Sequence, residues 1–288
     1  MTDLDELAVA VERPDDAARR EARELLGPEG TTGRLVDLAV WLAGVQGRVP
    51  AVPPSRARLL VLSDVAPERT VAVAAGTGVE VRLVGRRGEP GRRMETEDAC
   101  SREEALEAVL AGATLADEEV DAGTDLLVVA LPDPDLAVAV ATLVGLLTRS
   151  DASAVTATGQ DDAAWMLACA ATRDAMRRGR PVLADQVDLL ATVGGADLAV
   201  ATGLLLQAAA RRTPVVLDGP AVSAAALVAA RLSFRAPDWW LAGHLSPDPA
   251  HALALARVSL EPVLDLGLRG DAGTGALLAV PVLRAAVA

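Results

Sequence analysis

From about residue 58 onward, short uninterrupted apolar runs alternate with longer segments that carry apolar residues at helical spacing. A strand that is apolar at every position has no face for water, so it belongs in a parallel sheet covered by helices on both faces. We therefore predict an α/β fold with a Rossmann-like, mostly parallel sheet. The runs expected to form its buried strands are RLLVLSD, VEVRLVG, DLLVVALPD, ASAVTAT, TPVVLDG, DWWLAGH and EPVLDLG.

The segments between these runs carry helix signals. Ser101 and Glu104 form a capping-box pattern that predicts the start of one helix. Two further helices are expected near the N-terminus, followed by a Pro-rich linker. We expect residues 1–50, with part of the C-terminus, to form a small helical domain, and residues 57–288 to form the large α/β domain. The helices are predicted over 14–26, 34–45, 101–113, 136–147, 161–178, 196–212 and 221–232.

Composition limits the core and the partners. The chain has 288 residues, of which 51% are hydrophobic and only 2% aromatic, so Ala, Val and Leu must build a core in which helices and sheet approach closely. The net charge of −13 disfavours nucleic acid and membrane as partners. All 27 basic residues are Arg, which excludes Schiff-base chemistry and any phosphate contact through Lys.

Neither the cysteines nor the N-terminus suggests a metal, an export signal or an anchor. Cys100 and Cys169 are not spaced as metal ligands, and no cofactor is expected. The N-terminus lacks a signal-peptide pattern, and no apolar run approaches the ~18 residues of a spanning helix. We expect a cytoplasmic protein.

In open parallel sheets, ligands bind outside the carboxyl ends of the strands. Many of the predicted strands end in Asp, Gly or His, which makes these residues candidates for a binding site. The alternative is that Asp and Gly only begin loops and cap helices. The candidates are Asp64, Asp133, Asp135, Thr158, Gly159, Asp218, Gly219, His244, Asp265 and Gly267.

A glycine-rich turn precedes the last helical segment. Gly270, Gly273 and Gly275 surround Asp271 and Thr274, and such a turn can offer backbone N–H groups to a phosphate. A tight turn that merely caps the helix is the alternative.

Two other segments each allow two interpretations. Residues 85–100 are predicted to form a solvent-exposed loop, and the alternative is that their Arg side chains form a phosphate-binding cluster. His244 could hydrogen-bond a substrate, but its spacing from His251 does not suggest a metal site.

Four segments resemble the nicotinate-nucleotide:dimethylbenzimidazole phosphoribosyltransferases of cobalamin biosynthesis. Residues 33–48 resemble G-R-L-E-x-L-A-x-W-L-A-G-I-Q-G, and residues 185–232 resemble a stretch running through VGG to VVLDG and an Ala-rich helix. Residues 241–255 resemble a segment with H-x-S-x-E-P-G-H, and residues 261–279 resemble L-D-L-x-L-R-L-G-E-G-x-G-A-A-L. The middle of the chain matches poorly, and the chain is shorter than expected of the family.

The resemblance implies a Rossmann-like large domain, a small helical domain and a homodimer. It also implies transfer of phosphoribose from nicotinate mononucleotide to 5,6-dimethylbenzimidazole, which gives α-ribazole phosphate and nicotinate. A general base removes the proton of the benzimidazole. The substrate-binding residues that the resemblance implies are Asp64, Gly159, Gly194, Gly195, Asp218, Gly219, His244, Gly273, Thr274 and Gly275.

The chain departs from the family where the chemistry is expected. The base of the family is the Glu of its L-G-E-G motif, and Ala272 stands there; Asp271 beside it is the candidate substitute. Gly27 replaces a Lys, Val65 replaces a His, and the glycine-rich G-E-M-G-I-G-N-T-T loop is reduced to the surroundings of Gly159. Two hypotheses follow: an enzyme of this family, divergent or slow, or a catalytically silent paralogue that binds a nucleotide, an azole or a partner enzyme. On these departures, we expect purified protein to form no α-ribazole phosphate above background.

Overall fold

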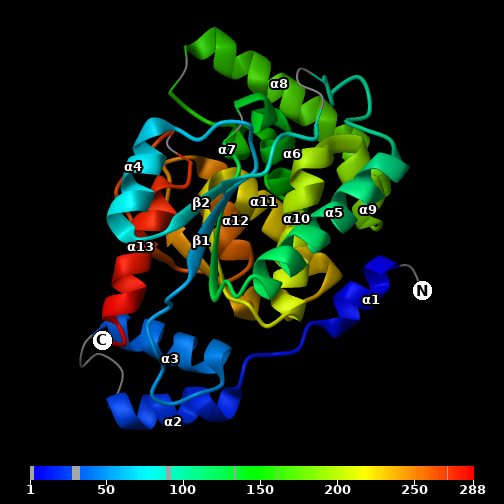
Figure 1. The fold of residues 1–288 in the computed structure, drawn as a ribbon. Coiled ribbons are helices and arrows are strands. Elements are labelled where there is room, and N and C mark those ends of the chain that lie inside the picture. The colour runs from blue at the N-terminus through cyan, green and yellow to red at the C-terminus, as the bar shows by residue number, and fades with distance from the viewer. Residues whose placement is uncertain (1–2, 28–32, 89–91, 133, 160, 271) are drawn as a thin grey trace.

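A six-stranded parallel sheet forms the centre of the molecule, as expected (Figure 1). The computed structural model describes residues 3–27, 33–88, 92–132, 134–159, 161–270 and 272–288. The strand order is β2-β1-β3-β4-β5-β6, and every neighbouring pair is parallel. The strands are β1 (Ala57–Val61), β2 (Glu80–Leu83), β3 (Leu126–Ala130), β4 (Val215–Asp218), β5 (Trp240–His244) and β6 (Pro262–Leu264).

Helices cover the sheet on both sides. Helices α4 and α13 pack together on one face, whereas α5, α10, α11 and α12 gather on the other (Figure 1). The helices are α1 (Asp3–Ala10), α2 (Asp16–Leu26), α3 (Arg34–Gln46), α4 (Glu68–Thr77), α5 (Arg102–Asp121), α6 (Ala137–Thr148), α7 (Ala152–Val155), α8 (Asp162–Gly179), α9 (Gln186–Leu189), α10 (Ala196–Ala210), α11 (Gly219–Leu232), α12 (Pro249–Arg257) and α13 (Thr274–Ala285). Short 3-10 turns occupy Pro134–Leu136, Arg180–Val182 and Ala236–Trp239, and a π-helical turn occupies Leu190–Gly194.

The order in which successive strands are added to the sheet changes direction between β1 and β3. The chain runs outward from β1 to β2, crosses back to β3, and then continues through β4 and β5 to β6. In doubly wound sheets, such a switch point opens a crevice between the carboxyl ends of the two strands. The position of this crevice matters for the site described below.

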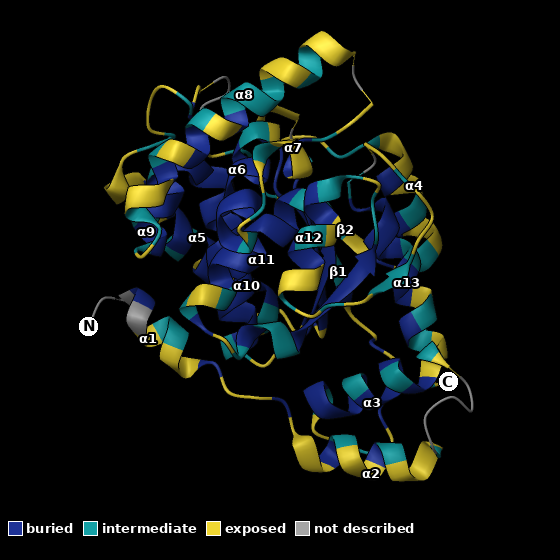
Figure 2. Cartoon of the chain, turned by 180° about the vertical axis from the view of Figure 1, so that it is seen from behind, coloured by how far each residue is buried: buried dark blue, intermediate teal, exposed yellow. Residues whose placement is uncertain are grey.

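Small side chains allow two buried helices to touch through their backbones. A Cβ atom at Gly203 of α10 would lie 1.8 Å from the carbonyl oxygen of Val109 in α5. A Cβ atom at Gly112 of α5 would lie 2.0 Å from the carbonyl oxygen of Val200 in α10. Figure 2 shows α10 and α11 as almost entirely buried within this one chain.

The N-terminal helices attach to the rest of the chain through indole hydrogen bonds. Helices α2 and α3 pack on each other below the sheet, and the C-terminal part of α13 reaches them (Figure 1). The Trp41 indole donates to the Asp238 carbonyl at 3.2 Å, and the Trp239 indole donates to the Glu12 carbonyl at 2.7 Å. Trp239 and Trp240 are both buried.

Three local expectations were wrong. In the predicted strand 152–158, Ala152–Val155 form α7 instead, because the backbone N–H and the hydroxyl of Thr156 both donate to the Ala152 carbonyl, at 3.0 and 2.7 Å, and close a helical turn. Strands β2 and β6 lie at the two edges of the sheet and are partly exposed rather than buried. The capping box at Ser101 and Glu104 is confirmed.

Candidate active site

A cavity of about 500 Å³ opens at the carboxyl ends of β3, β4 and β5. The lining from the segment after β3, from α6 and from α7 is apolar, and comprises Leu131, Pro132, Pro134, Ala137, Val140, Ala141 and Val155. The lining from the segments after β4, β5 and β6 mixes polar side chains and glycines with apolar residues. Its polar side chains and glycines are Asp218, Gly219, His244, Ser246, Asp248, Arg269, Gly270 and Gly275, and its apolar residues are Pro220, Ala221, Pro247, Ala250, Leu268 and Ala272.

Asp218, the last residue of β4, binds the turn before α13. Its Oδ2 accepts the backbone N–H of Gly273 at 2.6 Å, and its Oδ1 accepts that of Ala276 at 2.7 Å. These N–H groups lie at the helix start, where no preceding turn supplies carbonyl partners. Burial raises the pKa of Asp218, while both N–H donors and His244 act in the opposite direction. The carboxylate therefore caps α13 from a distant strand.

The turn before α13 fills the switch-point crevice. Gly273 has φ +93°, and a Cβ atom there would lie 3.3 Å from Leu59 of β1 and 3.4 Å from Ala130 of β3. Thr70 of α4 donates its hydroxyl to the Ala272 carbonyl and shares a second hydrogen bond with Thr274, both at 3.0 Å. Because this turn occupies the space between β1 and β3, the open cavity lies beside it, over β3 to β5.

Helix α13 also packs directly against His244. A Cβ atom at Gly275 would lie 2.5 Å from the Cβ of His244, so only glycine fits there. The Nε2 atom of His244 accepts the backbone N–H of Leu268 at 3.4 Å. Burial lowers the pKa of His244, against the opposing influence of Asp218 and Asp265. The imidazole is therefore a neutral acceptor that anchors the loop after β6.

The loop after β5 is held by the second histidine. His251 lies in the first turn of α12, and its Nδ1 accepts the backbone N–H of Ser246 at 3.1 Å. The Ser246 hydroxyl lies 2.9 Å from the same nitrogen. Burial lowers the pKa of His251 to about 4. Both histidines therefore serve loop geometry through unprotonated nitrogens.

Two charged residues of the cavity were missed as site residues by sequence reasoning. Asp248 is the N-cap of α12, and its Oδ1 accepts the backbone N–H of Ala250 at 2.9 Å. Arg269 follows β6 and donates to the Thr158 carbonyl at 3.4 Å. Burial raises the pKa of Asp248, and nearby Arg269 opposes that rise. In the sequence, Asp248 stands between two prolines, which is typical of a turn. It also falls at the Glu of the H-x-S-x-E-P-G-H segment that residues 241–255 resemble, and this signal could have marked it as a site residue.

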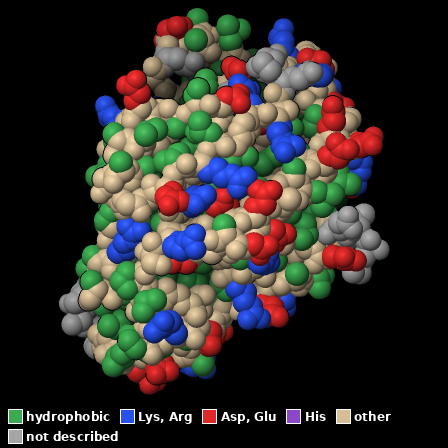
Figure 3. All heavy atoms as spheres, in the orientation of Figure 1, with side chains coloured by type: hydrophobic (Ala, Val, Ile, Leu, Met, Phe, Trp, Pro, Cys, Tyr) green, Lys and Arg blue, Asp and Glu red, His purple; other side chains and the backbone are tan. Residues whose placement is uncertain are grey.

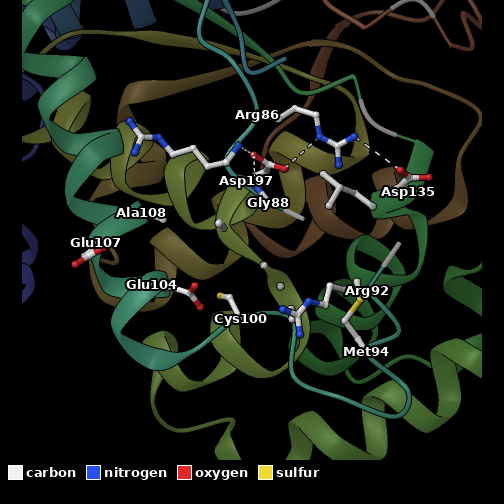
Figure 4. A pocket seen from close by; sticks show the side chains of 16 residues that line it. Arg86, Gly88, Arg92, Met94, Cys100, Glu104, Glu107, Ala108, Asp135 and Asp197 are labelled. Carbon is white, nitrogen blue, oxygen red and sulfur yellow. Dashed lines mark hydrogen bonds and ion pairs between the residues drawn. The ribbon is translucent and has the colours of Figure 1, made fainter. Parts of the chain in front are cut away.

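A second cavity of about 280 Å³ lies on the other side of the segment 134–136 (Figure 4). Asp197, near the start of α10, accepts the backbone N–H groups of Arg87 and Gly88 at 2.7 and 3.2 Å. The Arg86 guanidinium lies 3.8 Å from both Asp197 and Asp135. Asp197 thus holds the segment 86–88 against the start of α10. The lining of this second cavity also includes Arg92, Cys100, Glu104, Gly194 and Gly195.

The structure brings only some of the predicted residues together. Asp218, Gly219, His244 and Gly275 line the larger cavity, and Ala272 lies there too. Gly273 and Thr274 lie beneath it in the crevice. Gly194 and Gly195 line the second cavity, whereas Asp64 and Gly159 line neither. Asp271 lies outside the described residues.

In the described part of the chain, no group of three or more His, Cys, Asp or Glu residues could hold a metal ion. On the face shown in Figure 3, Arg side chains are interspersed with Asp and Glu side chains. Within the described ranges, no helix has the length and apolar character needed to cross a bilayer.

A parallel sheet with a cavity at its carboxyl edge is the arrangement in which doubly wound α/β proteins bind small ligands. A family model described as Phosphoribosyltransferase matches residues 62–288. The nicotinate-nucleotide–dimethylbenzimidazole phosphoribosyltransferase of Streptomyces avermitilis is 44% identical, over 99% of this chain and 89% of its own length. The Mycobacterium tuberculosis protein of that name is 43% identical, over 96% of this chain and 90% of its own.

Solved structures agree with these sequence matches. The crystal structure of the phosphoribosyltransferase of the same name from Thermus thermophilus superposes with a TM-score of 0.78 at 28% identity, over 95% of each chain. The chain belongs to the nicotinate-nucleotide:dimethylbenzimidazole phosphoribosyltransferase family. Its alignment with the Streptomyces avermitilis relative spans 337 positions, against 288 residues here, so the relative carries residues without a counterpart in this chain.

Proposed function

We propose that the larger cavity binds nicotinate mononucleotide and a benzimidazole-like base, and that the protein transfers the phosphoribosyl group between them. The observation that carries the proposal is one cavity at the carboxyl ends of β3, β4 and β5 whose lining contains both an apolar stretch and a group of polar side chains. The apolar residues after β3 and on α6 suit a flat methylated ring, and Arg269 with the neighbouring glycines suits a ribose phosphate. Family membership suggests the two substrates.

Arg269 is the main candidate for holding the phosphate. Among the described residues that line this cavity, it is the only Arg, and the chain has no Lys. A guanidinium can form two parallel hydrogen bonds to phosphate oxygens. At Gly219 and Gly270 a Cβ atom would meet nothing within 4 Å, so a phosphate can approach the backbone closely there.

The transfer itself forms one bond and breaks another. A nitrogen of the base bonds to the anomeric carbon of the ribose, and the bond from that carbon to the nicotinate nitrogen breaks. The pyridine nitrogen keeps the electron pair, and the azole loses its proton. Binding both reactants in one cavity lowers the entropy cost of reaching the transition state, because they have already lost translational and rotational freedom.

One observation favours a silent homologue as the second candidate. Ala272 lines the cavity at the position where the family motif has its Glu, and a methyl group accepts no proton. Such a protein would bind the nucleotide or the azole, or act on a partner enzyme, without turnover.

Incubation with nicotinate mononucleotide and dimethylbenzimidazole separates the candidates. Formation of α-ribazole phosphate and nicotinate in equal amounts, measured by liquid chromatography and mass spectrometry, would support the enzyme. Binding of either substrate in calorimetry without product would support the silent homologue. Neither binding nor turnover at millimolar concentration would overturn both small-molecule proposals.

We also propose a homodimer, as the family resemblance implies. The Ala-rich and Leu-rich helices α10 and α11 are buried within one chain, which removes them as an interface. Met166 and Leu167 on α8 are 65% and 73% exposed and offer an apolar surface instead. Sedimentation of wild-type protein and of Met166→Ser/Leu167→Ser tests both the dimer and its location.

A further inference from the structure

Phosphoribosyl transfer to an azole needs a group that takes the azole proton, and Ala272 cannot be that group. Among the described residues, two carboxylates line the cavity: Asp218 and Asp248. The two imidazoles nearby already use ring nitrogens as acceptors for Leu268 and Ser246. The choice within the described site is therefore between the two aspartates.

Asp218 is committed to the fold. Each of its oxygens accepts a short backbone hydrogen bond, from Gly273 and from Ala276. Protonation of the carboxyl would remove the negative charge that strengthens both hydrogen bonds, and charge-assisted hydrogen bonds are roughly twice as strong as neutral ones. This carboxylate is suited to remain ionised throughout a reaction cycle.

Asp248 is arranged differently. Its Oδ1 accepts the backbone N–H of Ala250 at 2.9 Å, and the backbone N–H of His251 also stabilises the ionised carboxyl. Within the described ranges, Asp248 does not hold a short backbone N–H contact on each oxygen as Asp218 does. Its own backbone N–H donates to the Ser246 hydroxyl at 3.4 Å, and Ser246 is held in turn by His251. The carboxylate thus sits on a fixed loop at the edge of the cavity, flanked by Pro247 and Ala250, which also line it.

We propose that Asp248 is the proton acceptor of this chain. The proposal rests on the phosphoribosyl transfer proposed above. As the azole nitrogen bonds to the anomeric carbon, the azole N–H proton passes to Oδ2 of Asp248, and the electron pair of the breaking C–N bond stays on nicotinate. Release of that proton to water restores the carboxylate.

The surroundings of Asp248 favour this role. A carboxylate with a raised pKa is a stronger base, and general bases work best when their pKa lies near the operating pH. Burial moves the pKa of Asp248 in this direction. Arg269 nearby keeps the ionised form populated and would lie close to the phosphate of the same substrate.

The test compares Asp248→Asn with the wild-type protein and with Asp15→Asn. Asn caps helices about as well as Asp, so the substitution removes basicity and retains the N-cap of α12. Asp15 is a matched control, because it caps α2 through Ala17 and Ala18 at 2.8 and 3.0 Å and lines neither cavity. We expect Asp248→Asn to lower kcat by about 100- to 10,000-fold with little change in the KM for nicotinate mononucleotide. Asp15→Asn should match the wild type.

A second readout separates proton transfer from general damage. The deficit of Asp248→Asn should shrink as the azole N–H becomes more acidic, for example from dimethylbenzimidazole to nitrobenzimidazole, because a more acidic proton needs less help. A constant deficit across the series would overturn the role of Asp248, and so would full activity of Asp248→Asn. Activity lost in Asp271→Asn and retained in Asp248→Asn would assign the role of proton acceptor to Asp271. If wild-type protein itself forms no product, the proposed transfer fails as well.

Discussion

The Asp218 carboxylate at the end of β4 accepts the backbone N–H of Gly273 at 2.6 Å, across 55 residues of sequence. With the second bond to Ala276, it fixes the start of α13 to the centre of the sheet. The same turn closes the crevice between β1 and β3 and brings Ala272 and Gly275 to the cavity. One buried carboxylate thus determines both a helix start and the shape of the site.

Asp218→Asn should therefore destabilise the protein. The amide has one acceptor oxygen, and its NH₂ group would face a backbone N–H, which leaves a buried donor without an acceptor. We expect a loss of about 1–3 kcal/mol in the free energy of unfolding, measured by urea denaturation. Asp64→Asn, at an exposed position that lines neither cavity, should change it by less than about 0.5 kcal/mol. Equal stability of the two variants would contradict the capping role.

Backbone contact between α5 and α10 makes Gly203 irreplaceable. In Gly203→Ala, the new methyl would lie 1.8 Å from the Val109 carbonyl oxygen, so the two helices must separate. Backbone atoms cannot rotate away as a side chain can, so we expect a loss of about 3 kcal/mol or more in thermal or urea unfolding. Gly76→Ala on α4 is the control, because its methyl meets nothing within 4 Å. It should stabilise the protein by about 0.5–1 kcal/mol through helix propensity. Comparable losses in the two variants would show that packing is not the cause.

Local sequence patterns predicted the alternation of helices and strands, because the hydrophobic period of each element depends only on residues close together in the sequence. They failed at α7, where the hydroxyl of Thr156 closes a turn that apolar alternation alone reads as a strand. They also failed to show that Asp218 caps a helix start 55 residues away, since such a contact exists only after the sheet forms. Asp248 was missed although it falls at the Glu of the H-x-S-x-E-P-G-H segment, because its place in the cavity depends on where β5 ends in space.

Acid should weaken the fold through His251. Burial lowers the pKa of this imidazole from 6.5 to about 4 in the folded state, so between these values the unfolded chain binds the proton more readily. Stability contributed by the neutral ring is present above pH 6.5, declines as the pH falls, and is fully lost below about 4. The loss amounts to about 3 kcal/mol.

The measurement is the free energy of unfolding at several pH values between 4 and 7 for wild type and His251→Asn. The Asn oxygen can accept the Ser246 N–H in place of Nδ1 but does not titrate. The variant should therefore show a flatter pH dependence than the wild type. Parallel curves would mean that His251 does not bind its proton differently in the two states.

Arg269 should recognise the phosphate and not the rest of the nucleotide. We expect Arg269→Ala to weaken binding of nicotinate mononucleotide by about 10- to 100-fold, which corresponds to the loss of a charge-assisted hydrogen bond worth about 1.5–3 kcal/mol. Nicotinate riboside, which lacks the phosphate, should bind the variant and the wild type equally in calorimetry. Arg269→Lys should fall between them, because an ammonium keeps the charge but loses the forked donor geometry. An equal loss for both ligands would show that Arg269 supports the loop through Thr158 rather than the phosphate.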